Sequence, residues 1–266
     1  MIRGIDHLVI ATEDPDAAAV DLEEAVGLRC TGGGRHEGLG TRNRIAWLAD
    51  GSYLELIGID DADRARTSPV GRASLHTLET HGPGLATYAL RVDDLPSSVA
   101  GLQAAGSSFG PPQHGSRLRD DGEVVEWRVA FPDGELGAAA TPFLIEHVYS
   151  GAEWGPSAME ERARFAHPIG SPVLLARLDL AVADPPSQAA DLHAELELDF
   201  WAVADLAVAD VGPHVLRLVP SREMAVPAVV TLGAAADAPR TAELFGLRFD
   251  VEHVDLPVPE LTSGRG

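Results

Sequence analysis

The order of elements along the chain constrains the fold most, because one strand–helix–strand arrangement recurs. Short apolar runs rich in β-branched residues are typical of strands, and an aspartate next to proline is typical of a helix start. Asp50 and Gly51 form a dipeptide that favours a tight hairpin between two of the strands. In the first copy the strands are expected at 5–11, 42–49 and 52–59, and the helix at 14–26.

The same order returns further along the chain. Asp94 and Asp184 each open a predicted helix, as Asp14 does, and they follow it by 80 and 170 positions. In the second copy the strands are expected at 85–92, 123–131 and 141–149, and the helix at 94–106. In the third copy the strands are expected at 174–183, 200–208 and 214–219, and the helix at 184–197. A weaker fourth copy has a strand at 228–232 and a helix at 237–245.

These repeats predict an α+β protein of paired βαβββ modules, whose curved mixed sheets surround a cup. Residues 1–150 form a domain of two modules, and 151–170 form a linker with a short helix near 157–165. Residues 171–257 form a degenerate third module and a partial fourth, and 258–266 form a tail.

The composition excludes several functions. The net charge is -21, and all 20 basic residues are arginine, so lysine Schiff-base chemistry and a Walker-type phosphate loop are excluded. An acidic surface repels nucleic acid and anionic membranes. The single cysteine, Cys30, allows no intrachain disulfide, and no apolar run is long enough to span a membrane. The sequence therefore predicts a cytoplasmic protein.

Three side chains are expected to meet inside the cup. Side chains alternate across a strand, so His7 and Glu55 face the cup if their apolar neighbours face the helices. Glu146 is the carboxylate of an otherwise apolar strand, and a charge on an inner face is costly unless it is paired or ligating. One imidazole and two carboxylates suit a divalent Zn, Mn, Fe, Ni or Co ion.

The chain resembles the glyoxalase-like domain family of the vicinal oxygen chelate superfamily over about residues 1–150. The motifs that carry the resemblance are IDHLVIATEDPDAA, GTRNRIAWLADGSYLELIGI, YALRVDDLPSSVA, VEWRVAFPDG and PFLIEH. The resemblance implies a cup in which a divalent metal chelates vicinal oxygens of a small substrate. Isomerases, lyases, epimerases, dioxygenases and drug-binding resistance proteins share this fold, so the fold alone does not decide the function.

The resemblance assigns His7, Glu55 and Glu146 as metal ligands. Glu55 and Glu146 are also the candidate catalytic groups, one of them acting as a proton shuttle. Thr87 departs from the family pattern, because threonine is a poor ligand at a position where a strong one is usual. His114 or His167 is an alternative ligand, and loss of the metal is another outcome. The residues expected to line the substrate pocket are Asn43, Trp47, Thr87, Trp127 and His167.

Simpler structural roles compete with these assignments. Glu55 and Glu146 are also explained as ion-pair partners of Arg44, Arg117 or Arg128. His36 and His114 lie near glycines and are expected in solvated loops, and the glycines at 32–34 in a loop over the mouth of the cup.

In the third module, Arg177 and Arg217 replace His7 and Glu55, and a cationic pair cannot bind a metal. This module is therefore expected to serve packing, dimerisation or closure of the cup.

Two functions follow from the sequence. The first is a metal-dependent lyase, isomerase or dioxygenase that acts on a small oxygenated metabolite. The second is a metal-free protein that sequesters a small molecule in the same cup. Both imply a small-molecule partner and allow a homodimer.

Overall fold

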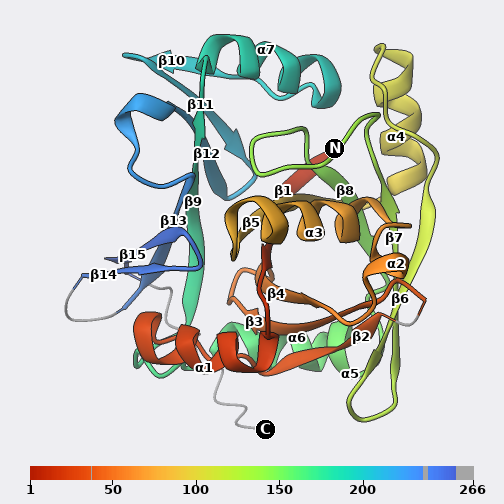
Figure 1. The fold of residues 1–266 in the computed structure, drawn as a ribbon, viewed down its shortest axis with the longest axis vertical. Coiled ribbons are helices and arrows are strands. Elements are labelled where there is room, and N and C mark those ends of the chain that lie inside the picture. The colour runs from red at the N-terminus through yellow and green to blue at the C-terminus, as the bar shows by residue number, and fades with distance from the viewer. Residues whose placement is uncertain (37, 236–238, 256–266) are drawn as a thin grey trace, which may run out of the picture.

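Eight strands of the N-terminal part form a closed barrel, and seven C-terminal strands form a second sheet beside it (Figure 1). The computed structural model describes residues 1–36, 38–235 and 239–255. The barrel strands are β1 (Ile2–Ala11), β2 (Gly32–His36), β3 (Thr41–Trp47), β4 (Tyr53–Ile59), β5 (Gly84–Val92), β6 (Gln113–Arg119), β7 (Val124–Ala130) and β8 (Phe143–His147). Their order around the barrel is β1-β4-β3-β2-β6-β7-β8-β5. The expected α+β fold with curved mixed sheets is confirmed.

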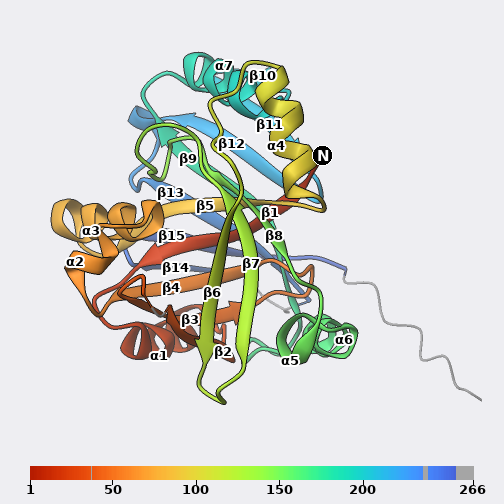
Figure 2. The same ribbon diagram turned by 90° about the vertical axis from the view of Figure 1, so that its right-hand side faces the viewer.

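The two modules of the barrel are joined along two seams. At one seam β1 and β5, the first strands of the modules, pair antiparallel. At the other, β2 pairs with β6 over a short stretch. Within the modules, β1 pairs parallel with β4, and β5 pairs parallel with β8. Each module therefore contributes four neighbouring strands to the barrel, which Figure 2 shows from the side of β6 and β7.

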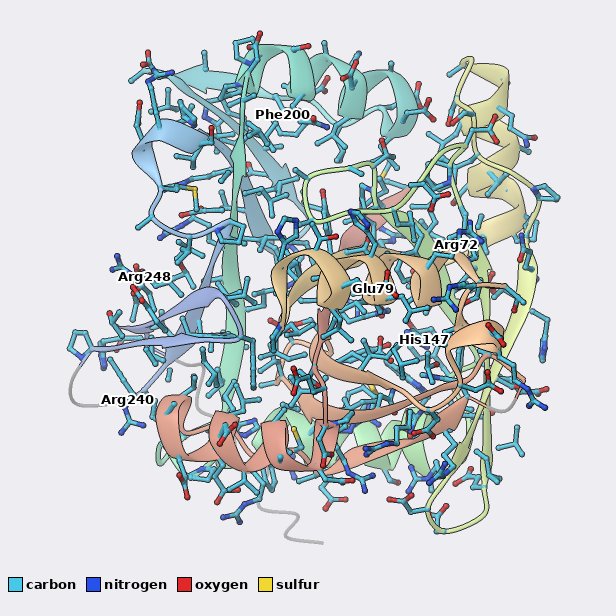
Figure 3. All side chains as sticks on the ribbon, in the orientation of Figure 1. Arg72, Glu79, His147, Phe200, Arg240 and Arg248 are labelled. Carbon is cyan, nitrogen blue, oxygen red and sulfur yellow. The ribbon has the colours of Figure 1, made fainter. Side chains whose placement is uncertain are left out.

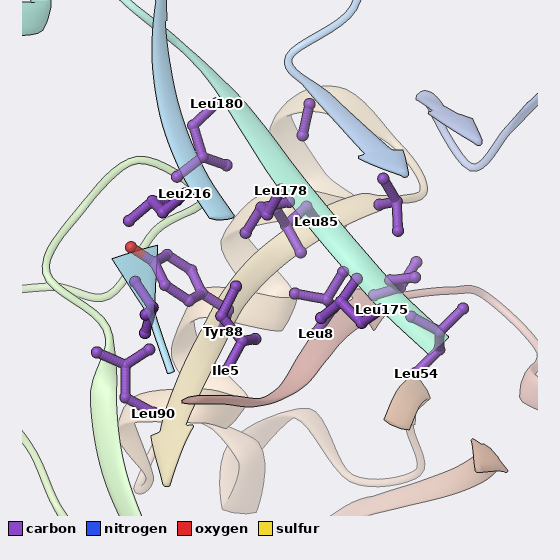
Figure 4. Packing of buried hydrophobic residues seen from close by; sticks show 14 of the residues in the cluster. Ile5, Leu8, Leu54, Leu85, Tyr88, Leu90, Leu175, Leu178, Leu180 and Leu216 are labelled. Atoms are coloured by element: carbon purple, nitrogen blue, oxygen red, sulfur yellow. The ribbon is translucent and has the colours of Figure 1, made fainter. Parts of the chain in front are cut away.

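The second sheet has the strand order β10-β11-β12-β9-β13-β15-β14. Its strands are β9 (Val173–Val182), β10 (Trp201–Val203), β11 (Leu206–Val211), β12 (His214–Pro220), β13 (Ala228–Ala234), β14 (Arg240–Leu244) and β15 (Leu247–His253). One face of this sheet packs on the outside of β1 and β5, and Leu8, Tyr88, Leu178 and Leu216 belong to the same buried cluster (Figure 4). The C-terminal part is thus fixed to the barrel by a continuous apolar core.

Helices begin where the aspartates predict them. The helices are α1 (Pro15–Val26), α2 (Ala62–Ala65), α3 (Pro69–His81), α4 (Leu95–Ala104), α5 (Gly151–Trp154), α6 (Pro156–Arg164) and α7 (Pro185–Leu196), with the 3-10 turn η1 (Ser221–Glu223). Asp14, Asp94 and Asp184 are the N-caps of α1, α4 and α7, and each side chain accepts a backbone N–H of the first turn. No helix in the described part of the chain is long and apolar enough to cross a membrane.

Several elements differ from the sequence-based expectation. The glycines at 32–34 belong to β2, not to a loop, and a Cβ on Gly34 would collide with the backbone of Leu118 on β6. The glycines are therefore needed where the barrel closes. The sequence did not reveal β6, β15 or α3, and the segment expected as one strand at 200–208 forms β10 and β11.

The helix expected at 237–245 is wrong, because its later residues form strand β14. Residues 236–238 and the tail expected at 258–266 lie outside the described residues.

Because the second sheet packs on the barrel, we expect Leu178→Ala to destabilise the folded protein strongly. Leu178 is fully buried between the two sheets, so removing its side chain leaves a cavity and lowers the free energy of unfolding by about 2–5 kcal/mol. Urea denaturation followed by tryptophan fluorescence measures the change. Val124→Ala on the exposed side of β7 is the control, with an expected change within about 0.5 kcal/mol. Equal changes in the two variants would show that the sheet does not stabilise the barrel.

Candidate functional site

A cavity of about 200 Å³ lies inside the barrel. Its walls are mostly apolar and aromatic, and its polar groups come from both modules. The aromatic residues are Tyr53, Trp127, Phe131, Phe143 and Trp154, and the main polar ones are His7, His36, Asn43, Glu55, Arg117 and His147. A mainly apolar hollow with a few convergent polar groups is typical of a small-molecule site.

A β-bulge in β1 brings two adjacent polar side chains to one cluster. Ile5 pairs with Leu90, whereas His7 pairs with the next residue along, Ala89, so β1 carries one extra residue at Asp6. Strand alternation is interrupted there. As a result Asp6 and His7 are both buried and contact each other, while Ile5 packs into the core outside the barrel.

The Asp6 carboxylate is shared by two imidazoles. Its Oδ1 lies 2.8 Å from Nδ1 of His7 and 3.0 Å from Nε2 of His147. Burial alone raises the pKa of Asp6, but the charges and hydrogen bonds of His147 and His7 outweigh it and hold the pKa well below its usual range. An ionised carboxylate only accepts hydrogen bonds, so both ring nitrogens that face Asp6 carry protons.

Glu55 on β4 faces the other side of His7. Its Oε2 lies 3.6 Å from His7 Nε2, and its Oε1 accepts a hydrogen bond of 2.6 Å from Nδ2 of Asn43. His36 approaches the same carboxylate, with Nε2 at 3.8 Å from Oε1. The side chains of His7, Glu55 and Asn43 therefore form one buried cluster at the cavity.

His36 is part of this cluster and does not lie in a solvated loop, as the sequence suggested. It is buried at the end of β2, and its Nδ1 lies 2.8 Å from the hydroxyl of Thr41. Burial lowers the pKa of His36 from 6.5 to about 4, and the nearby Glu55 charge only partly offsets this. His114, on β6, is exposed and sits at the rim.

Aromatic rings hold the imidazoles in place. His7 stacks on Tyr53 with ring centroids 4.4 Å apart, and His147 stacks on Trp154 at 3.7 Å. Trp154 belongs to α5, in the segment that the sequence suggested was a linker. The same helix carries Glu153, which forms a buried ion pair with Arg117 of β6. Helix α5 therefore completes the cavity wall.

Glu146 does not join the cluster, although the sequence suggested it as a metal ligand and a catalytic group. Its side chain accepts a 2.9 Å hydrogen bond from the backbone N–H of Leu95, at the start of α4, and lies 3.3 Å from Arg128. The next residue, His147, lines the cavity instead. Figure 3 labels its side chain in the barrel part of the structure. The expected strand register was one residue out, and such a slip moves every side chain to the opposite face.

The residues expected in the pocket divide into two groups. Asn43 and Trp127 line the cavity. Trp47 lies behind the wall, where the guanidinium of Arg162 covers its ring at 3.4 Å. Thr87 is fully buried in β5 opposite Val9 and does not line the cavity.

His167 holds the chain together and is not a pocket residue. Its Nε2 donates to the carbonyl of Trp47 at 2.9 Å, and its Nδ1 accepts from the N–H of Arg29 at 3.1 Å.

The imidazole and carboxylate side chains of the cavity are of types that bind metal ions. They do not form the expected set of ligands, which was His7, Glu55 and Glu146. Glu146 faces away, and one oxygen of Glu55 is taken by Asn43. No group of three or more His, Cys, Asp or Glu side chains among the described residues is placed to hold a metal ion. The metal site implied by the resemblance thus does not fit the side chains as they are arranged.

The third module carries no comparable cluster at the equivalent positions. Arg177 and Arg217 both bind Asp179, at 3.0 and 2.9 Å. Burial raises the pKa of Asp179, and the two arginines oppose this. One local carboxylate therefore offsets part of the charge of the cationic pair.

Comparison with known proteins identifies the family. A model described as a glyoxalase-like domain matches residues 5–196. The chain belongs to this family. The glyoxalase-like match covers both barrel modules and continues through β9 and α7, so the family unit extends into the second sheet. No protein of curated function matches the sequence.

Solved structures share the fold of this glyoxalase-like protein at low identity. A hypothetical protein from Staphylococcus aureus superposes with a TM-score of 0.77 and 13% identity, over 96% of this chain and 100% of its own. A variant of 4-hydroxymandelate synthase from Streptomyces coelicolor superposes with a TM-score of 0.54 and 15% identity, over 88% and 71%. Methylmalonyl-CoA epimerase from Mycobacterium tuberculosis matches with a TM-score of 0.41 and 21% identity, over 55% and 88%.

The low pKa of His36 predicts acid sensitivity. The unfolded chain binds a proton at His36 near pH 6.5, whereas the folded chain binds it only near pH 4. Between these pH values protonation favours the unfolded state, so the free energy of unfolding decreases as the pH falls from 6.5 to about 4. The free energy of unfolding of His36→Asn should decrease less than that of wild type between these pH values. The difference between the two decreases should reach up to about 3 kcal/mol. Urea denaturation at a series of pH values measures this, with His114→Asn, an exposed histidine, as the control. Parallel pH profiles for wild type and His36→Asn would contradict the assignment.

Proposed function

We propose that the protein is an enzyme that moves a proton on a small oxygenated metabolite bound in the barrel cavity, by isomerase or lyase chemistry. The observation that carries this proposal is that the side chains of Glu55 and His7 face each other. Asn43 hydrogen-bonds to Glu55, and Asp6 hydrogen-bonds to His7. Each reactive side chain has one polar atom engaged by the protein and one directed to the other. This arrangement resembles an acid–base pair whose geometry is set before a ligand binds.

The hydrogen bonds define the role of each atom. Asp6 accepts from Nδ1 of His7, so Nε2 is the atom that exchanges protons with the cavity. Asn43 holds Oε1 of Glu55, which leaves Oε2 as the basic oxygen. The proposed base is therefore Glu55, which takes a proton from carbon next to a carbonyl. When His7 carries a second proton on Nε2, it donates that proton to the oxygen on which negative charge develops, and the ring returns to its neutral form with the proton on Nδ1.

The cavity walls support this chemistry by excluding water. Tyr53, Phe143 and Trp154 surround the histidines, and apolar surroundings strengthen the electrostatic interactions between a base and its substrate. A ligand that fills about 200 Å³ has the size of a small metabolite.

Metal dependence, which the family resemblance implied, is a separate question. His7, His36 and Glu55 are donor types that suit Zn, Mn, Fe, Ni or Co, yet as arranged they do not form a ligand set. The proposed proton transfer uses only side chains of this chain.

A metal-free binding protein is the second candidate. The cavity is largely apolar, and Trp127 lines it, so a ligand can be held without reaction. Quenching of tryptophan fluorescence by a ligand that the protein does not turn over would favour this role.

Glu55→Gln should abolish proton exchange. We expect wild-type protein in D₂O to exchange the hydrogen next to the carbonyl of at least one member of a panel of small hydroxyketones and aldehydes. The variant should lose at least about a hundredfold in rate, because the amide cannot act as a base. Proton NMR measures the exchange.

The matched control is Glu146→Gln, an equivalent change of a glutamate on the outer face of β8. Its rate should stay close to that of wild type. Equal losses in both variants, or exchange that survives in Glu55→Gln, would contradict the proposed role of Glu55.

Chelation tests the role of a metal. Protein treated with EDTA and passed over a desalting column should keep its exchange rate within about twofold, because the proposed acid and base are side chains. Elemental analysis of the same sample gives the metal content. Loss of exchange on chelation, with recovery on adding one divalent metal, would show that an ion draws His7, His36 and Glu55 together.

A further inference from the structure

Two residues that line the cavity each carry a buried hydrogen-bond acceptor that no other described residue uses. Oδ1 of Asn43 and Nδ1 of His147 are buried atoms with no hydrogen-bond partner among the described residues, and both residues line the cavity. Buried polar atoms are almost always hydrogen-bonded, and an unmet one costs about 1–3 kcal/mol. Two such atoms in one cavity therefore indicate a ligand that supplies the missing partners.

The contact with Glu55 shows which end of the Asn43 amide is the donor and which is the acceptor. The Glu55 carboxylate accepts hydrogen bonds, so the Asn43 atom 2.6 Å from it is the amide nitrogen, which donates. The other end of the amide is then the carbonyl oxygen, which only accepts. A ligand atom that meets it has to be a donor.

Asp6 decides the chemistry of His147 in the same way. The low pKa of Asp6 keeps it ionised, and His147 donates to it through Nε2 at 3.0 Å. In the neutral ring the remaining nitrogen, Nδ1, is an acceptor. Stacking on Trp154 at 3.7 Å holds the ring in this orientation, so it does not turn to satisfy Nδ1 elsewhere.

We propose that the cavity recognises a neutral ligand through hydroxyl groups that donate hydrogen bonds to Asn43 Oδ1 and His147 Nδ1, and that Asp6 is the positioning residue that makes His147 an acceptor. This proposal rests on the proposed function, because the ligand occupies the same cavity as the proposed substrate. An ether or carbonyl oxygen offers no donor and leaves both acceptors unmet. An ammonium group is a donor, but it would pair with Glu55 and occupy the base.

Matched ligands test this recognition. Resorcinol and cyclohexanediol are compared with their dimethyl ethers, and cyclohexanediol also with diaminocyclohexane. Dissociation constants come from tryptophan fluorescence, and the binding site from shifts of ¹⁵N-histidine resonances. Wild-type protein should bind at least one diol about tenfold more tightly than its ether, the effect of one hydrogen bond of ordinary strength. Equal affinities within both pairs, a preference for the diamine, or no binding of either diol would overturn the proposal.

Substitutions separate recognition from packing. His147→Phe keeps an aromatic ring against Trp154 but removes the acceptor, so the preference for a diol over its ether should fall about tenfold. Trp127→Phe is the control, because it alters the wall for both ligands and should leave their ratio unchanged. A ratio that falls equally in both variants would overturn the assignment of His147.

The role of Asp6 has a spectroscopic readout that packing alone does not change. In wild-type protein the ¹⁵N shifts should show Nε2 of His147 and Nδ1 of His7 protonated, and Asp6→Asn should redistribute these protons and weaken the diol preference. Asp50→Asn is the control, since Asp50 is a largely enclosed carboxylate in the turn between β3 and β4 and faces His214 instead. A wild-type spectrum with His147 Nε2 unprotonated overturns the role of Asp6 even if the variant does not fold.

These measurements need no turnover, so they are distinguishable from a test of the proposed function. A diol preference without proton exchange would support the recognition and count against the enzyme. Proton exchange without a diol preference would support the enzyme and overturn the recognition.

Discussion

A buried carboxylate needs hydrogen-bond partners, and in this protein Asp6 finds them in two histidines from different modules. His7 lies next to Asp6 in the chain, whereas His147 comes from β8, and the closure of the barrel brings them within 2.8 and 3.0 Å of the same oxygen. The burial of an ionised group is costly unless it is hydrogen-bonded. The interaction therefore orients both rings and links the two modules at the cavity.

The rest of the site follows from that arrangement. With one nitrogen of His7 held by Asp6, the other is free to face Glu55, which Asn43 holds in turn. His36 reaches the same carboxylate from β2, and burial keeps it neutral over most of the physiological pH range by lowering its pKa to about 4. The cavity thus has an acid–base cluster at one end and aromatic walls around the remainder.

The second sheet explains why β1 serves two surfaces at once. Leu8 and Ile10 face the core shared with the C-terminal strands, while His7 and Val9 face the barrel interior. In the C-terminal part, the arginines at positions expected to match His7 and Glu55 are paired with Asp179. That part of the chain therefore contributes packing on the barrel, with no counterpart of the acid–base cluster at those positions.

The sequence identified some parts of the site and missed others for physical reasons. Asn43, Glu55 and Trp127 lie in the cavity because simple strand alternation holds on β3, β4 and β7. His7 lies there too, because alternation resumes on β1 after the bulge. Asp6 was missed because its bulge breaks alternation, and no local signal in the sequence marks it. His147 was displaced by Glu146 because the register of a short strand depends on its neighbours. His36 was assigned to a loop because glycines are typical of loops, although here they allow two strands to approach.

The amino-acid sequence by itself determined the local elements: the aspartate caps of α1, α4 and α7, the apolar strands and the α+β class. These depend on hydrogen bonds and side-chain patterns within a few residues, so they can be derived from short segments. Only the tertiary structure decided which side chains share the cavity, that α5 completes its wall, and that Asp6 joins two histidines. Those outcomes depend on strand register and barrel closure, which are set by contacts between residues more than a hundred positions apart, as Asp6 and His147 are.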